Sequence, residues 1–264
     1  RIGSVVQADG TGEVFIMGGA AVGVLGVIQT NGGAVNIFTG PNTSFVTNSG
    51  AVAVINTAFN GATGGDITIN ADNIDITSPI NAGNRTVTIK PVLANRSVDL
   101  GTEVNAKISL TDAELSRITA NQVNIHAGAS GGDITVTAPL AHPASNGMGL
   151  FTPVGRVDIN AALNRGAGTV GIFTDTGISG TGQLSASQVF LYSNSGDVNY
   201  AGQIITSNLG FQTLGNVLLQ NPANDIVGIG NSIGGNGFGG IAITDGVGNL
   251  SINGQVQSNG FILG

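Results

Sequence analysis

Three aspartates stand at equivalent places in a repeated Gly-Asp unit, and they are the first candidates for chemistry. Asp66, Asp133 and Asp197 occur in the stretches "GGDITIN", "GGDITVT" and "GDVNY". Carboxylates can hydrolyse or eliminate glycosidic bonds when two of them, or a carboxylate and a basic side chain, converge in one groove. Single aspartates in separate repeats instead fit hydrogen bonding to turn amides. The sequence therefore predicts a structural role for these three residues.

Other catalytic and metal-binding arrangements are incomplete in this chain. His126 and His142 are its two histidines, and it has no cysteine. Two histidines without a third ligand do not make a zinc site, and no Ser-His-Asp set can be assembled around them. No glycine-rich loop carries the lysine of a phosphate-binding loop. We predict that the chain is not an enzyme and that it holds no catalytic metal and no cofactor.

The balance of charges excludes two classes of partner. Eight Lys and Arg residues stand against 15 Asp and Glu residues, giving a net charge of −7. Scattered basic residues cannot form the cationic surface that nucleic acids or anionic lipids require. The most apolar stretch, residues 14–28, is shorter than the ~20 residues of a spanning helix and is interrupted by glycines. We predict no nucleic-acid partner and no membrane insertion.

A short repeated unit must position all of these residues. The unit is a turn with Gly or Asn followed by an alternating strand, as in "GGAVNIF" (32–38), "GRVDINA" (155–161) and "GNVLLQ" (215–220). Alternation places Val or Ile on one face of each strand. A unit that is too short to bury its own face and recurs near every ~20 residues is typical of a solenoid.

The predicted fold is therefore all-β, a right-handed parallel β-helix of roughly thirteen coils. We expect one β-helical segment over residues 1–264, as part of a longer chain or as a fibre subunit. An antiparallel sandwich or barrel is the alternative. Glycine makes up 44 of the 264 residues, and Gly and Asn would supply left-handed backbone angles at the coil corners. Asparagines at those corners could also pair from coil to coil.

Charges gather in one segment, residues 91–120, which we interpret as an insertion between coils. Its stretch "SLTDAELSRITA" (109–120) contains a capping box, with Thr111 as the N-cap and Glu114 reaching back, and predicts a short helix near residues 111–118. Two hypotheses stay open: the insertion is a solvated cover, or it is a contact element that binds a glycan or a cell-surface protein. The candidate contact residues are Arg96, Asp99, Glu103, Lys107, Asp112, Glu114 and Arg117.

The apolar stretch 14–28 is the second candidate surface. It is apolar on both strand faces, so another layer or another chain must cover it. We predict self-association of the chain through a packing patch there. The patch consists of Val14, Phe15, Ile16, Val22, Val24, Leu25, Val27 and Ile28.

Residues 88–140 resemble a module of very large bacterial exoproteins of the filamentous-haemagglutinin type. The shared pattern is a T-I-x-P strand (Thr88, Ile89, Pro91), a D-L-G turn (99–101) and the S-L-T-D-A-E-L-x-R-I run at 109–118. The resemblance implies a β-helical fibre, secreted or displayed on the bacterial cell surface, exported through an outer-membrane partner and often used for adhesion. It carries over no catalytic residue.

Together these observations predict an extracellular structural β-solenoid that forms part of a surface fibre, filament or adhesin stalk and that self-associates. An adhesin module that binds glycan or protein through residues 91–120 is the alternative. A glycan-active β-helix enzyme is a third reading.

Overall fold

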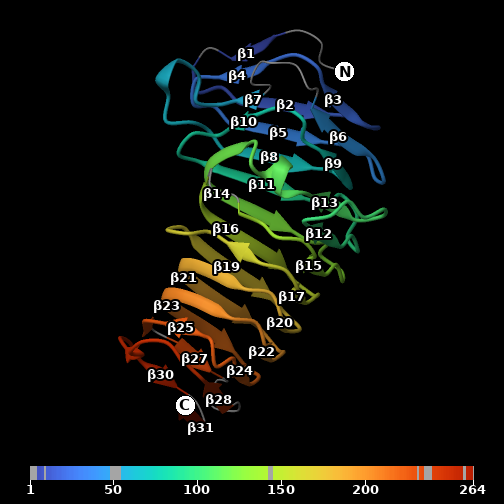
Figure 1. Ribbon diagram of the computed structural model, residues 1–264. Coiled ribbons are helices and arrows are strands. Elements are labelled where there is room, and N and C mark those ends of the chain that lie inside the picture. Colours follow the sequence, from blue (N-terminus) through green and yellow to red (C-terminus); the bar gives the residue numbers. More distant parts are fainter. Residues whose placement is uncertain are drawn as a thin grey trace.

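The computed structural model describes residues 5–8, 10–47, 55–141, 145–230, 232–234, 240–257 and 260–263. The chain forms an all-β parallel solenoid of about ten turns with one short α-helix, which confirms the predicted all-β parallel β-helix. Figure 1 shows the strands stacked one below another along a single axis, from the N-terminal to the C-terminal part of the chain.

The turns build three walls. A 19-stranded sheet forms the first two walls, and a nine-stranded and a three-stranded sheet form the third. The first wall contains β1 (Val6–Ala8), β4 (Ile28–Thr30), β7 (Ile55–Asn56), β10 (Ile80–Asn81), the start of β14 (Ile118–His126), β18 (Leu163–Asn164), the starts of β21 (Leu184–Ser193) and β23 (Ile204–Thr213), and β25 (Asp225–Ile226).

The second wall continues from the same long strands and carries the candidate site described below. It contains β2 (Val14–Met17), β5 (Val35–Phe38), β8 (Ile67–Asn70), β11 (Thr86–Lys90), the end of β14, β16 (Ser145–Thr152), β19 (Thr169–Thr174), the ends of β21 and β23, β26 (Gly228–Ile229), β27 (Ser232–Gly234), β29 (Ser251–Ile252) and β30 (Val256–Gln257).

The third wall consists of short strands. It contains β3 (Val22–Val24), β6 (Ser44–Thr47), β9 (Asn73–Asp75), β13 (Ile108–Leu110), β12 (Val98–Leu100), β15 (Ile134–Val136), β17 (Val157–Ile159), β20 (Ile178–Gly180), β22 (Val198–Tyr200), β24 (Val217–Leu219), β28 (Gly240–Ile243) and β31 (Gly260–Leu263). Outside the walls lie a 3-10 turn, η1 (Phe59–Gly61), and the helix α1 (Asp112–Leu115).

Parallel pairing in register stacks like residues on like residues and so builds the core. Val35, Ile67, Val87 and Val123 are successive partners in β5, β8, β11 and β14, and all four side chains are fully buried. Full burial of such a side chain contributes about 1.5–3 kcal/mol. This aliphatic column therefore ties the four coils to one another and contributes to their stability.

The solenoid has about ten turns rather than thirteen because two coils are much longer than the average spacing. Val35 pairs with Ile67, so one long coil carries residues 39–66, including η1. Val87 pairs with Val123, and the coil between them carries the charged segment 91–120.

Glycine serves close approach between coils as well as backbone angles. A Cβ atom on Gly33 would lie 2.0 Å from the carbonyl oxygen of Gly12, and one on Gly65 would lie 2.2 Å from that of Gly33. Neither distance is possible for non-bonded atoms, so this corner accepts only glycine at positions 33 and 65, in two successive coils. Asparagines also pair between coils, since Asn81 Nδ2 donates to Asn56 Oδ1 at 3.2 Å.

Candidate functional site

The three aspartates of the repeated unit bind backbone amides of the following coil. The distances to Oδ1 are 3.0 Å from the Thr86 amide to Asp66, 2.9 Å from the Arg156 amide to Asp133, and 2.7 Å from the Asn216 amide to Asp197. Each carboxylate thus satisfies a donor at a corner, as the sequence pattern predicts, and the three do not converge on one groove.

The charged segment 91–120 supplies the strands β12 and β13 to the third wall, and it also contains the helix α1. The order of its strands is reversed: β12 precedes β13 in the chain, yet β12 pairs with β15 while β13 lies beside β9 of the preceding coil. The two strands are parallel neighbours, with Val98 opposite Ile108. The helix α1 has the predicted capping box at Thr111 and Glu114, and it buries Leu115.

Most of the candidate contact residues in this segment bind the solenoid itself. Arg96 donates to the carbonyl oxygens of Asp72 and Ala106, at 2.8 and 2.9 Å. Arg117 donates to those of Ile76 and Ala113.

Three of the four acidic members behave in the same way, and Glu103 is the exception. The buried Asp99 carboxylate accepts the hydroxyls of Thr102 and Thr137 and lies 3.8 Å from Lys107 Nζ. Asp112 Oδ1 accepts the Ala141 amide at 2.7 Å. Glu114 is 7% exposed and accepts the Ile76 amide. Glu103 is exposed, and partial burial together with the neighbouring Glu114 raises its pKa to about 6.

The packing patch divides between the interior and the surface. Val14, Val22, Val24 and Ile28 line the core, and Ile16 and Val27 are partly buried. Phe15 and Leu25 are exposed to 58% and 44%, and the neighbouring Met17 to 72%. The ring of Phe15 lies 5.1 Å from that of Phe38 in the next coil. The apolar surface at this part of the solenoid is therefore centred on Phe15 and Met17.

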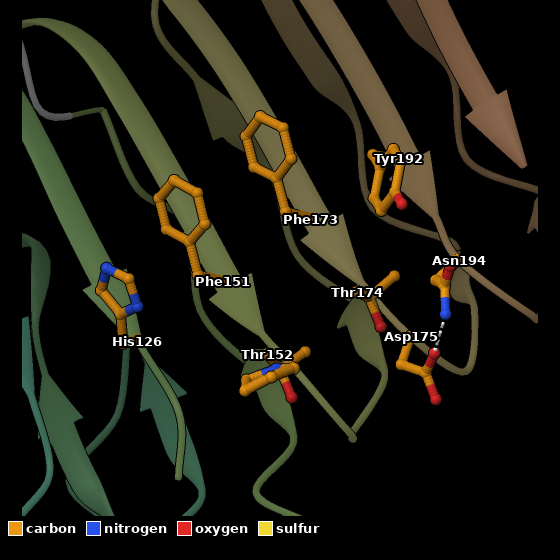
Figure 2. A pocket seen from close by; sticks show the side chains of 9 residues that line it. His126, Phe151, Thr152, Phe173, Thr174, Asp175, Tyr192 and Asn194 are labelled. Carbon is orange, nitrogen blue, oxygen red and sulfur yellow. Dashed lines mark hydrogen bonds between the residues drawn. The ribbon is translucent and has the colours of Figure 1, made fainter. Parts of the chain in front are cut away.

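A row of rings on the outer face of the second wall is the most distinctive surface feature, and it is shown in Figure 2. The aromatic row consists of His126, Phe151, Phe173 and Tyr192, which occupy the same register position in β14, β16, β19 and β21. The ring centroids are separated by 4.6, 4.8 and 6.2 Å in that order. The first three rings are nearly parallel, so they stack in the offset geometry that aromatic pairs prefer.

Glycines beside the aromatic row form a trough. At the register position two residues earlier stand Gly149, Gly171 and Phe190 on β16, β19 and β21, followed by Gly210 on β23. On β14 this position is held by Asn124. A Cβ atom on Gly149 would lie 2.4 Å from the Phe151 ring, and one on Gly171 would lie 2.8 Å from the Phe173 ring. Glycine is therefore required for the rings to lean over the strand.

The far side of this glycine trough is a column of polar side chains. Gln122, Thr169, Gln188 and Asn208 stand there on successive strands, with Gly147 between the first two. Together with the rings of Phe173 and Phe190, they line a hollow of about 360 Å³. The hollow is a groove with one polar wall, one aromatic wall and a floor of backbone.

A second hollow, of about 420 Å³, lies on the other side of the aromatic row. This corner hollow is lined by the four rings and by Thr152, Pro153, Thr174, Asp175 and Asn194 at the strand ends (Figure 2). Asn194 Nδ2 donates to Asp175 Oδ1 at 2.8 Å. The Phe173 ring borders both hollows, so the aromatic row is a ridge between two grooves.

His126 joins this row as a neutral ring. Burial lowers the pKa of its imidazole, and the nearby positive charge of Lys90 lowers it further. Neutral imidazole stacks on Phe151 with an angle of 12° between the ring planes. His142, the other histidine, lies outside the described residues. No group of three or more His, Asp or Glu side chains is placed to hold a metal ion within the described ranges.

Sequence reasoning did not find the aromatic row. The signal that could have found it is an aromatic residue followed by a hydroxyl residue at the end of a strand, in "LFT" (150–152), "IFT" (172–174) and "LYS" (191–193). The hydroxyls of Thr152 and Thr174 turn inward and donate to the carbonyls of Gly132 and Gly155, while the rings point outward. Unequal coil lengths hide the alignment in the sequence.

Comparison with protein-family models, with curated proteins and with solved structures finds no match to this chain. Within the described residues, no helix has both the length and the apolar character needed to cross a membrane. The assignment of a function therefore rests on the fold and on the surfaces described above.

Proposed function

We propose that this chain is a non-enzymatic structural shaft, a β-solenoid segment of a fibre, filament or adhesin stalk on a bacterial cell surface. The observation that carries the proposal is the use of polar side chains to join coil to coil. The Asp66, Asp133 and Asp197 carboxylates each bind an amide of the following coil. Carboxylates that bind backbone amides between coils stiffen a rod. These three aspartates therefore form no converging acid–base pair with one another.

The extracellular location rests on the resemblance of residues 88–140 to filamentous-haemagglutinin-type exoproteins. The same resemblance supports export through an outer-membrane partner. Strand pairing from coil to coil also fits this setting, because a solenoid needs only contacts between neighbouring repeats to fold.

Self-association is the second part of the proposal. Phe15 and Met17 expose most of their side chains beside the Phe15–Phe38 ring pair. Large exposed apolar side chains that cluster in this way are typical of contact surfaces. A second copy of the chain is the partner we propose for them.

Electron microscopy and sedimentation test the proposal together. Negatively stained protein should show straight rods about 50 Å long per copy, from about ten turns at ~4.8 Å per strand. Sedimentation equilibrium should show association that a Phe15→Ser, Met17→Ser double variant weakens. A Val92→Ser, Val154→Ser variant, which removes exposed valines elsewhere, is the matched control. A wild-type chain that stays monomeric at high concentration would contradict the self-association part.

A further inference from the structure

The glycine trough has the lining of a binding groove for an uncharged ligand. Its described lining residues are glycine, valine, threonine, phenylalanine, glutamine and asparagine, with no charged side chain among them. An anionic ligand would find no cation in the trough, and a cationic ligand would find no carboxylate there. Among the described lining residues of the two grooves, the one formally charged side chain is Asp175, in the corner hollow.

The polar wall presents two exposed side-chain amides. Gln188 and Asn208 are exposed, they are register partners on β21 and β23, and their side-chain amides make no hydrogen bond to another described residue. An amide side chain both donates and accepts, which suits a ligand rich in hydroxyl groups. Gln122, by contrast, already donates to Asn124 Oδ1 at 3.0 Å.

The aromatic wall supplies the complementary apolar contact. Phe190 replaces glycine within the trough, and its ring lies 5.8 Å from that of Phe173 at an angle of 40°. The rings of Phe151 and Phe173 are stacked, so they cover each other's faces. The rings of Phe173 and Phe190 are tilted, so they do not cover each other's faces in this way. A flat apolar group can stack on a ring face that is left open in this way.

We propose that the glycine trough binds a neutral polysaccharide chain. A sugar ring presents C–H groups on its flat faces and hydroxyl groups around its edge. The faces match the rings of Phe173 and Phe190, and the hydroxyls match the amides of Gln188 and Asn208. The polar and aromatic columns continue over several coils along the solenoid axis, which suits an extended chain of sugars.

An apolar peptide or a second copy of this chain fits the trough less well. Either partner would bury the Gln188 and Asn208 amides against apolar groups, and burial of an unpaired amide costs free energy. A hydroxyl-rich ligand replaces the water on those amides instead. The inference goes beyond the proposed shaft role and does not depend on it, so rods can form whether or not the trough binds sugar.

Isothermal titration calorimetry with defined oligosaccharides tests the proposal. The probes are cellohexaose, laminarihexaose and chitohexaose, with a heparin hexasaccharide as the anionic comparison. We expect at least one neutral probe to bind and heparin not to bind. The variant Phe190→Ala should lower the association constant roughly tenfold through loss of a stacking face, and Gln188→Ala should also lower it.

Val154→Ala is the matched control because Val154 is an exposed apolar side chain that lies neither in the lining of the trough nor in the surface centred on Phe15 and Met17. It should bind like the wild type. Circular dichroism checks that Phe190→Ala folds, and exposed Gln188 gives a second variant that does not disturb ring packing. The proposal is overturned if no neutral probe binds, if heparin binds as well as the best of them, or if both trough variants bind like the wild type. Loss of self-association in Phe190→Ala without loss of sugar binding would instead assign the trough to contacts between copies.

Discussion

Replacement of Glu114 by alanine should separate the helix α1 from the preceding coil. Glu114 Oε1 accepts the Ile76 amide at 2.9 Å, and Oε2 accepts both the amide and the hydroxyl of Thr111, at 2.9 and 2.8 Å. One carboxylate therefore closes the capping box and reaches a residue of the preceding coil.

The cost can be estimated from these bonds. Loss of a capping interaction costs about 1 kcal/mol. The Ile76 amide would also lose its partner in a buried environment, where Ile76 is fully buried, and an unsatisfied buried donor costs about 1–3 kcal/mol. We expect Glu114→Ala to lower the free energy of unfolding by about 2–4 kcal/mol. Glu114→Gln keeps an acceptor oxygen for one of these donors and should cost less.

Hydrogen exchange read by mass spectrometry locates the effect, and urea unfolding measures its size. The peptide that contains Ile76 should exchange much faster in Glu114→Ala, while peptides from β21 and β23 should not change. Glu13→Ala removes an exposed carboxylate and should change stability by less than about 0.5 kcal/mol. If Glu114→Ala were as stable as Glu13→Ala and the Ile76 amide stayed protected, the helix would not be anchored through this carboxylate.

Three further predictions concern titration and the coil corners. The pKa of His126 is lowered in the folded state, so the unfolded chain binds the proton more readily. The free energy of unfolding should therefore fall as the pH drops below ~6.5. In urea unfolding, His126→Phe should lose less of this free energy over the same pH range. The pKa of Glu103 is raised from 4.5 to about 6, so the folded state binds the proton more readily. The free energy of unfolding should therefore decline as the pH rises from 4.5 through 6. Glu103→Gln should flatten this part of the plot of unfolding free energy against pH. Asp133→Ala should cost about 0.5–1.5 kcal/mol by removing the acceptor of the Arg156 amide, Asp133→Asn should cost less, and calorimetric unfolding of the two variants distinguishes these outcomes.

The walls of the solenoid were predictable because their chemistry is local. Alternation of Val and Ile with polar residues in "GGAVNIF" or "GRVDINA" specifies a strand with one buried face, and a strand of that length needs neighbours on both sides. The capping box at Thr111 was predictable for the same reason, since all of its atoms lie within four residues. The number of turns was not predictable, because it depends on how many residues lie in each connection between strands.

The aromatic row could not be read in the same way because it is a property of register. Phe151, Phe173 and Tyr192 lie in coils of unequal length, and their alignment becomes visible only when Val123, Met148, Val170 and Val189 are placed opposite one another in the core. Inward packing thus fixes which outward side chains meet. The trough follows from that register, since it needs glycine at 149 and 171 beside the rings.

The concentration of charge in residues 91–120 has a structural explanation in the reversed order of β12 and β13. Where strand order is regular, each backbone group finds its partner on the next coil. Where the strand order is reversed, some backbone groups lose that partner and bind a charged side chain instead. Arg96 donates to the carbonyl oxygen of Asp72, and Arg117 donates to the carbonyl oxygen of Ile76. The carboxylate of Glu114 accepts the amide of Ile76. Hydrogen bonds to charged groups contribute more than neutral ones. In a chain with only 9% charged residues, a cluster of charges therefore marks the place where the coil repeat breaks, and a contact role for residues 91–120 rests on the exposed Glu103 and the partly exposed Lys107.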